Sequence, residues 1–400
     1  MIDCPHLIDA GCQIAGNFCG VPTVPVAEDA CTFCTTKTKE PKAPNSVTAG
    51  LALRWLRQND EERLAQVKSE LYGYLQGCAN RTPAKNGEAA KADCLRLVCE
   101  LSPGDMMTLT AAVESLVKAY PGKWKIQVAG TAMDIWQNNP HIHELDCGEQ
   151  ETALLIKMEY PVIHRSNQTH VPFVAGYTDF LGAVLGVNLP LLVNRPHLYL
   201  SADEKSWMSQ IQELTGDRRP YAIVDAGVKS DYTAKQWPVE YYQEIVNQTK
   251  DQIEWVQIGS AEHDHPLLDN VIDLRGETDT RQLIRLVYHC QLAIGPVTFL
   301  QHLSAAWEKP YLCMLGGREP LTWVNYPKQH TFHTIGQLSC CQDTACWKSK
   351  ITGGDSVCEF PVLTGIRPVG KCMQSITPTE VLCVLRRLLP NVDTLQPRSR

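Results

Sequence analysis

Residues 95–109 constrain the fold of this chain more than any other stretch. They begin with an apolar run of strand length, which ends in Ser-Pro-Gly-Asp at 102–105. Apolar residues then recur at three- and four-residue steps up to Val117, which is the pattern of one helix face. The stretch therefore predicts a strand, a tight loop and a helix. In an open α/β sheet such a loop lies at the carboxyl edge, where ligands bind, so Asp105 is the first candidate for a chemical role.

The alternation of strand and helix patterns continues along the chain. Strands of a first unit are predicted at 94–101, 125–128 and 154–158, with helices at 106–119, 133–136 and 180–185. Strands of a second unit are predicted at 221–227, 252–258, 271–274, 292–295 and 311–315, with helices beginning at Ser201, Thr278, Phe299 and Thr377. Such alternation is typical of doubly wound parallel sheets.

A chain of 400 residues is long enough for two or three domains. We expect an α/β protein of two Rossmann-like doubly wound domains facing a cleft, with an additional Cys-rich N-terminal segment. The expected boundaries are a Cys-rich segment with a helix at 1–80, a first domain at 90–200, a second at 201–335, and a Cys-rich tail with a final helix at 336–400.

The net charge of −7 predicts no general attraction to nucleic acid or to acidic membranes. No apolar run approaches the ~20 residues that a membrane helix needs. The first residues lack the basic segment and apolar core of a secretory signal, so we expect a cytoplasmic protein.

Seventeen cysteines are many for such a protein, and an odd total without an export signal argues against a disulfide framework. Ten of them fall in two groups, which are Cys4, Cys12, Cys19, Cys31 and Cys34 near the N-terminus and Cys340, Cys341, Cys346, Cys358 and Cys372 near the C-terminus. Either group offers enough thiolates for a structural zinc site, or less readily for an iron–sulfur cluster. The alternative is a set of reduced thiols that bind no metal ion.

Five short motifs occur in order over residues 94–335. They are Ser-x-Gly-Asp at 102–105, Lys-x-Trp-Pro at 235–238, Ile-Gly at 258–259 with Glu262, Asp-Leu-x-Gly-x-Thr at 273–278, and a Gly-to-Ala stretch at 295–306. Together they resemble the heptosyltransferase-like glycosyltransferases of family nine, which have the two-domain GT-B architecture. No run matches the Gly-x-Gly-x-x-Gly pattern of dinucleotide-binding sites or the P-loop pattern, so the sequence does not support either kind of nucleotide site.

The resemblance implies an enzyme that transfers a hexose or heptose from a nucleotide-sugar donor to an acceptor hydroxyl with inversion. Asp105 would be the general base, although it also stands where a helix N-cap is expected. Lys235 would neutralise the leaving diphosphate, which is the electrostatic role a positioned lysine fills well. The residues expected at the donor are Lys235, Gly227, Glu262, Thr298, Phe299 and His302.

Three of these residues also have a structural interpretation: Lys235 as a surface lysine, His302 as a buried packing residue, and Glu262 as a helix cap. The backbone N–H groups at 298–300 would hold phosphate oxygens at a helix start. The polar loop at 160–168 predicts acceptor contacts from His164, Arg165 and Asn167.

One departure from the family pattern concerns the donor site. The acid of the family's Asp-Ser-Gly falls on Val297, and its glycine on Phe299, so that only Thr298 keeps a hydroxyl. Val297 favours a first alternative, a non-catalytic binding or scaffold protein. The Cys clusters suggest a second alternative, a nucleic-acid base sugar transferase with Cys-rich metal modules. The second has little support, because no basic stripe with interleaved aromatic residues is visible.

Overall fold

The structure is a computed structural model, and it describes residues 93–158, 171–207, 209–216, 219–323, 325–354, 356–365 and 367–389. It also describes the backbone of three short strands, β1 (Leu7–Ile8), β2 (Gly11–Cys12) and β3 (Val24–Pro25), which pair in the order β1-β2-β3. The described residues divide into two compact units. The first comprises 93–100, Ala112–Ala129 and His141–Leu192, and the second comprises Leu101–Ala111, Gly130–Pro140 and the chain from Val193 onward.

The first unit is built around a three-stranded sheet in the order β5-β4-β6. Its strands are β4 (Cys94–Cys99), β5 (Lys125–Gly130) and β6 (Leu154–Lys157), and β4 and β6 run parallel. The predicted strand, loop and helix are confirmed, because β4 leads through residues 100–102 into α4 (Pro103–Ala119). The other elements of this part of the chain are α5 (Cys147–Thr152) and α6 (Phe173–Leu185), and the 3-10 helix η2 (Met133–Trp136) belongs to the second unit.

The second unit contains a six-stranded parallel sheet in the order β12-β11-β10-β7-β8-β9. Its strands are β7 (Tyr221–Val224), β8 (Glu254–Gln257), β9 (Ile272–Asp273), β10 (Leu292–Pro296), β11 (Tyr311–Gly316) and β12 (Gln329–His333). In chain order this is 3-2-1-4-5-6 read from the β9 edge, the doubly wound order, in which ligands bind where the order reverses. That point lies between the ends of β7 and β10.

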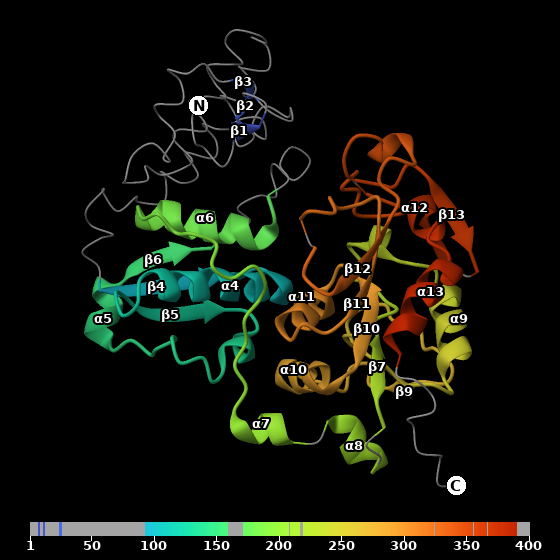
Figure 1. The fold of residues 1–400 in the computed structure, drawn as a ribbon, viewed down its shortest axis with the longest axis horizontal. Helices are drawn as coiled ribbons and strands as arrows, with labels where there is room; N and C mark the ends of the chain where they lie inside the picture. The colour runs from blue at the N-terminus through green and yellow to red at the C-terminus, as the bar shows by residue number, and fades with distance from the viewer. Residues whose placement is uncertain are drawn as a thin grey trace. The chain divides into compact units, whose positions relative to one another are not determined.

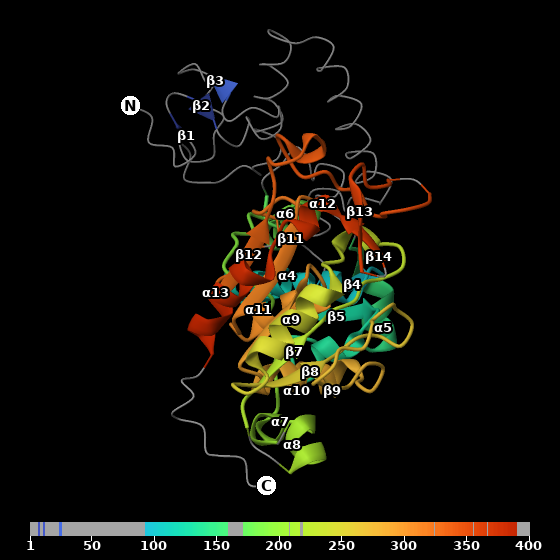
Figure 2. The same ribbon diagram turned by 90° about the vertical axis from the view of Figure 1, so that its right-hand side faces the viewer.

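Helices cover both faces of this sheet (Figures 1 and 2). On one side lie α9 (Val239–Thr249) and α13 (Pro378–Leu388), and on the other lie α10 (Thr280–His289) and α11 (Phe299–Ala306). The predicted capping boxes at Ser201 and Thr377 are present. The prediction that Thr278 caps a helix is wrong: Asp279 caps α10, because its carboxylate and the Gln282 side chain satisfy each other's backbone N–H groups.

The remaining elements are short. They are α7 (Ala202–Ser206), α8 (Gln210–Thr215), η4 (Thr233–Lys235), η5 (Ser339–Cys341), the antiparallel hairpin of β13 (Pro361–Thr364) and β14 (Arg367–Gly370), and α12 (Lys371–Gln374). Among the described residues, no helix combines the length and the hydrophobicity that crossing a bilayer requires.

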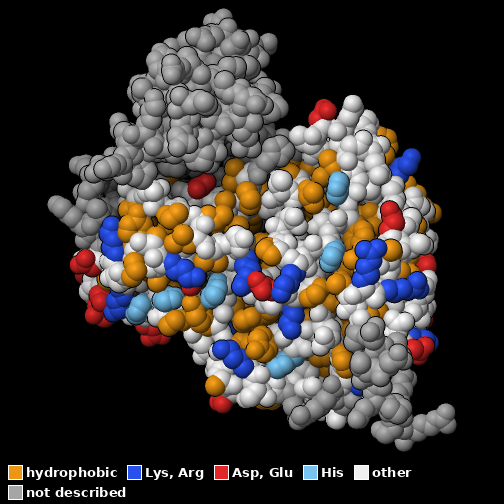
Figure 3. Space-filling view, in the orientation of Figure 1, with side chains coloured by type: hydrophobic (Ala, Val, Ile, Leu, Met, Phe, Trp, Pro, Cys, Tyr) orange, Lys and Arg blue, Asp and Glu red, His pale blue; other side chains and the backbone are white. Residues whose placement is uncertain are grey.

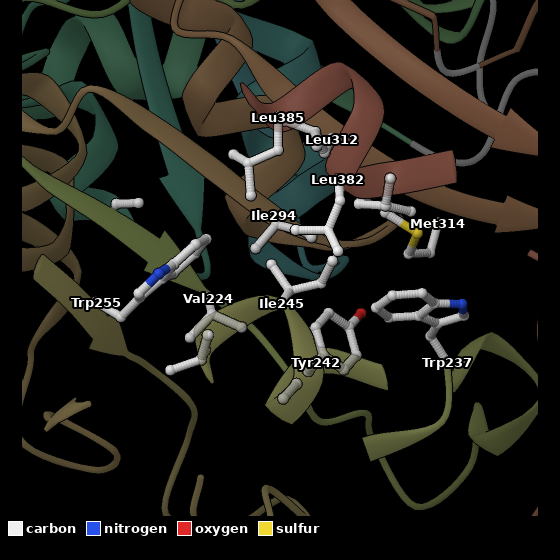
Figure 4. Close-up of a cluster of buried hydrophobic side chains, with 14 of the residues drawn as sticks. Val224, Trp237, Tyr242, Ile245, Trp255, Ile294, Leu312, Met314, Leu382 and Leu385 are labelled. Atoms are coloured by element: carbon white, nitrogen blue, oxygen red, sulfur yellow. The ribbon is translucent and has the colours of Figure 1, made fainter. Parts of the chain in front are cut away.

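A buried hydrophobic cluster joins α9 and α13 to the sheet (Figure 4). Trp237 is fully buried in it, its ring meets the Tyr242 ring edge-on at 4.7 Å between centroids, and its indole N–H donates to the carbonyl oxygen of Ile376. The tryptophan of the Lys-x-Trp-Pro motif therefore belongs to the core. It also fixes the turn that carries Lys235, two residues earlier.

The substitution Leu385→Ala tests this cluster. Leu385 lies on α13 and is fully buried, so truncation leaves a cavity and is expected to lower the free energy of unfolding by about 2–5 kcal/mol. Urea denaturation measures the loss. The matched control is Arg387→Ala, an exposed position on the same helix, where a change within about 0.5 kcal/mol is expected. Equal losses at both positions would contradict the packing described here.

Candidate functional site

Asp105 lies in the first turn of α4 and is only 3% exposed. Its interpretation as the helix N-cap is wrong, because the helix begins at Pro103 and Asp105 is its third residue. The carboxylate reaches back instead, and Oδ2 accepts hydrogen bonds from the Ser102 hydroxyl at 2.6 Å and the Ser102 backbone N–H at 3.1 Å. A carboxylate in the first turn is favoured by the helix dipole. Both effects fix its position at the end of β4.

His302 packs directly against the first turn of α4, which carries Asp105. A Cβ atom placed on Gly104 would lie 3.2 Å from His302 Cδ2, so the absence of a side chain allows the contact. His302 Nδ1 lies 2.8 Å from the Tyr326 hydroxyl, which also interacts with Thr108 of α4. Burial and the nearby Lys235 charge lower the pKa of His302 to about 4, so the imidazole is neutral at pH 7. All these residues belong to the second compact unit.

Lys235 ends the 3-10 turn η4 and is 18% exposed at its side chain. Its ammonium donates to the Val297 carbonyl oxygen at 2.8 Å and forms an ion pair with Glu319 at 2.9 Å. Glu319 also pairs with Arg318. Burial lowers the pKa of Lys235, and the Glu319 carboxylate opposes that shift. Burial alone would raise the pKa of Glu319, but Lys235 and Arg318 hold it below its usual value.

The start of α11 lies at the carboxyl end of β10, beside the point where the strand order reverses. Thr298 precedes the helix but does not cap it, and its hydroxyl donates to Asp225 Oδ2 at 2.9 Å. Phe299 is the first helical residue. The Val297 side chain is buried, while its carbonyl oxygen holds Lys235, a contact that any side chain at 297 would allow. A helix start of this kind suits a phosphate group.

Gly227 and Glu262 lie in the loops after β7 and β8. Glu262 is exposed in a turn, and its backbone N–H donates to the Ser260 hydroxyl. Gly227 is covered by His265, whose Nδ1 would be 2.0 Å from a Cβ atom at this position. His265 Nδ1 lies 3.4 Å from Asp225 Oδ1, and both ring nitrogens are buried with no hydrogen bond to any residue that the structure describes. The donor loops therefore carry an imidazole that the motifs did not indicate.

The C-terminal cysteines gather around the end of β11. A Cβ atom on Gly317 would lie 2.8 Å from Cys341 Sγ and 3.7 Å from Cys372 Cβ, and one on Gly370 would lie 3.2 Å from Cys372 Sγ and 3.7 Å from Cys358 Sγ. The Cys346 N–H donates to the Gly317 carbonyl oxygen at 2.9 Å. Burial and the neighbouring thiols raise the pKa of Cys340 to about 12 and of Cys372 to about 11.

These five thiols are free. In the part of the chain that the structure describes, no group of three or more His, Cys, Asp or Glu side chains is arranged to hold a metal ion. The C-terminal thiols lie near one another around Gly317 and Gly370, but in the described residues they do not point at one common position as the ligands of a bound ion would.

Several predicted residues lie outside the described part. They are the acceptor residues His164, Arg165 and Asn167 and the side chains of Cys4, Cys12, Cys19, Cys31 and Cys34. Sequence reasoning also missed Asp225, His265, Arg318, Glu319 and Tyr326. Their position in the sequence could have indicated them. Asp225 follows β7, His265 lies in the loop after β8, and Arg318 and Glu319 lie in the loop after β11, all at the carboxyl edge of the sheet.

The geometry brings together an acid, a neutral imidazole, a buried ammonium and a helix start. Asp105 could accept a proton from a hydroxyl within hydrogen-bond distance. Lys235 could stabilise negative charge that develops on a leaving group, because a cation in a partly buried site acts more strongly than one in water.

Comparisons with known proteins identify the family and the fold of the chain. The sequence matches glycosyltransferase family 9 (heptosyltransferase) over residues 149–350, about half of the chain. Lipopolysaccharide heptosyltransferase 2 of Salmonella typhimurium is 26% identical over 145 residues, which make up 33% of this chain and 41% of that protein. The match thus spans about two fifths of the length of the curated relatives.

Two solved structures share the fold. The ADP-heptose lipopolysaccharide heptosyltransferase II of E. coli has a TM-score of 0.50 at 20% identity, over 74% of this chain and 98% of that chain. The iron-containing dodecameric glycosyltransferase TibC of enterotoxigenic E. coli has a TM-score of 0.51 at 17% identity, over 74% and 76%. The likeness confirms the predicted GT-B fold class. With the family match covering half of the sequence, this chain belongs to glycosyltransferase family 9, the heptosyltransferase family.

Proposed function

We propose that this protein transfers a sugar from a nucleotide-sugar to an acceptor hydroxyl with inversion at the anomeric carbon. The supporting observation is the assembly, within one compact unit, of the first turn of α4 with Asp105, of His302 and of Lys235 beside the start of α11. Asp105 takes the proton of the acceptor hydroxyl as its oxygen attacks the anomeric carbon. The bond from that carbon to the diphosphate oxygen breaks, its electron pair leaves with the diphosphate, and Lys235 stabilises the charge.

The donor we propose is an ADP-sugar, with ADP-heptose first. The name of the E. coli relative with the same fold includes ADP-heptose. In this chain the start of α11 would face the phosphates, and Thr298, Phe299, Gly227 and Glu262 would lie around the nucleotide. The polar residues His164, Arg165 and Asn167 stay a prediction for the acceptor.

The test is release of free nucleoside diphosphate from ADP-heptose, ADP-glucose, UDP-glucose and GDP-mannose, with binding of each donor measured by calorimetry. We expect the ADP-sugars to bind, and ADP to be released slowly to water even without the acceptor. Failure of every donor to bind would contradict the proposal and favour a non-catalytic scaffold, the alternative to which Val297 points.

A sugar transferase acting on nucleic acid is less well supported. On the face drawn in Figure 3, Lys and Arg side chains lie in small groups among hydrophobic and acidic ones. Phosphate-backbone binding draws on a concentrated basic surface and weakens steeply with salt. A gel shift that salt abolishes would revive this alternative.

We further propose that the C-terminal cysteines hold a structural metal ion, either zinc or iron. The support is the gathering of Cys341, Cys358 and Cys372 against Gly317 and Gly370, and the thiolate chemistry that both metals accept. Cys340 and Cys346 belong to the same group, because Cys340 adjoins Cys341 in the chain and the Cys346 N–H donates to the Gly317 carbonyl oxygen. The bound ion would tie the loop of residues 340–358 to the end of β11. The N-terminal cysteines stay a prediction for a second site.

Elemental analysis tests this metal site. We expect about one equivalent of zinc or iron per chain, and its loss in Cys372→Ser, because a closed structural site takes four protein ligands. The matched control is Cys383→Ser, an exposed thiol of α13, which should keep the metal. Metal content that is the same in both variants, or absent from the freshly purified protein, would contradict the site.

A further inference from the structure

Glu319 is a buried carboxylate that neither the motifs nor the proposed reaction assigns. It follows β11 in the loop after Gly316 and is 2% exposed. Its two charged neighbours come from separate parts of the chain: Lys235 from the turn before α9, and Arg318 from the adjacent position. A buried carboxylate persists only with such partners, because desolvation otherwise costs several kcal/mol.

The loop that carries Glu319 is anchored on several sides. Arg318 Nε donates to the Lys348 carbonyl oxygen at 3.0 Å, and the Trp347 N–H donates to the Arg318 carbonyl oxygen at 3.0 Å. The Tyr232 ring lies 5.1 Å from the Arg318 guanidinium and 5.5 Å from the Lys235 ammonium. The carboxylate is therefore held in place by contacts that do not involve Lys235.

The Lys235 ammonium, in contrast, depends on Glu319. Among the described residues, its other polar contact is the neutral Val297 carbonyl, and Arg318 is a like charge nearby. Lys235 and Arg318 together set two cations against the one carboxylate of Glu319, so this cluster carries a net charge of about +1, which suits a diphosphate. Without Glu319, Lys235 would be a buried cation facing a second cation.

We infer that Glu319 is a positioning residue, which holds the Lys235 ammonium charged and aimed at the donor diphosphate without touching the substrate. The inference rests on the proposed function. Among the residues that the structure describes, the groups that face Lys235 are Glu319, Arg318, Tyr232, His302 and Cys313. Of these, Glu319 is the one carboxylate, so its removal should change the pH at which Lys235 loses its proton.

The experiment measures the dissociation constant of ADP by calorimetry between pH 7 and 10 for the wild type, Glu319→Gln and Glu319→Asp. Wild-type affinity should hold until Lys235 deprotonates and then fall. In Glu319→Gln the fall should begin at least about one pH unit lower, since loss of a carboxylate within ion-pair distance shifts a neighbouring pKa by about 1–3 units. Glu319→Asp keeps the charge and should lie between the two.

Two further variants test whether the loss of ADP affinity at alkaline pH comes from Lys235. Lys235→Arg should remove the alkaline fall, because a guanidinium stays charged throughout this range. Glu308→Gln removes a carboxylate on the surface of the same unit and should leave the profile unchanged. Thermal unfolding of each variant checks the fold, and Glu319→Asp carries the test if Glu319→Gln does not fold.

The outcomes separate the two proposals. An unchanged midpoint in both Glu319 variants, or an alkaline fall that survives in Lys235→Arg, would overturn the role of Glu319 and leave the proposed function intact. Absence of ADP binding by the wild type at every pH would overturn the proposed function, and this inference with it.

Discussion

Asp105→Asn is expected to reduce sugar transfer by about 10²- to 10⁴-fold while ADP affinity stays within about 2-fold of the wild type. Asparagine keeps an oxygen that can accept the Ser102 hydrogen bonds, so α4 should start as it does in the wild type. What it loses is the ability to take a proton from the acceptor. The measurement is the initial rate of ADP release in the presence of the acceptor, together with ADP calorimetry.

Two controls distinguish this loss from a structural effect. Ser102→Ala removes the hydroxyl that donates to Asp105 but keeps the carboxylate, so loss of this hydrogen bond should cost about 1 kcal/mol of stability and less than about 10-fold in rate. Asp279→Asn changes the cap of α10 and should leave the rate unchanged. A rate for Asp105→Asn within about 3-fold of the wild type would remove Asp105 from its proposed role.

Lys235→Ala is expected to weaken ADP binding and to lower the transfer rate by about 10²- to 10³-fold, because a donor aimed at developing charge is worth that much in a water-poor site. The substitution also leaves Glu319 with Arg318 as its one remaining ion-pair partner in the described part of the chain. Some loss of thermal stability should therefore accompany the loss of activity. Steady-state kinetics and calorimetry give the rate and the binding separately.

The matched control is Lys250→Ala, an exposed lysine at the end of α9. It removes the same charge from the protein as a whole and should change neither the rate nor ADP affinity. Similar losses in both lysine variants would mean that net charge, and not the position of Lys235, supports binding.

The second sheet could be predicted from sequence because its central strands are short apolar runs between turn residues. β7, β10 and β11 are buried along their whole length, which is the expected pattern for parallel strands covered on both faces. β12 was missed because Gln329, His330, Thr331 and His333 make it polar. It lies at the edge of the sheet, where burial does not impose an apolar sequence.

Local competition explains the wrong helix starts. Asp279 and Gln282 form a reciprocal capping box, which determines the start of α10 more strongly than Thr278 could. At α4, Pro103 takes the first helical position, where its missing N–H costs nothing, and Asp105 falls inside the first turn.

The site was predictable only where residues follow a motif. Asp105 and Lys235 stand in short motifs, and their roles stay predictions. The pairing of Lys235 with Glu319 joins residues that are far apart in the sequence, so no local pattern could reveal it. The same holds for Thr298 and Asp225, whose hydrogen bond crosses from the end of β10 to the end of β7.

The most direct test of the central claim is a crystal structure of the protein with ADP bound. We expect the diphosphate to lie at the start of α11, with an oxygen within hydrogen-bond distance of Lys235 Nζ and with His302 beside it. A nucleotide bound elsewhere, with Lys235 still paired only to Glu319 and Val297, would contradict the account.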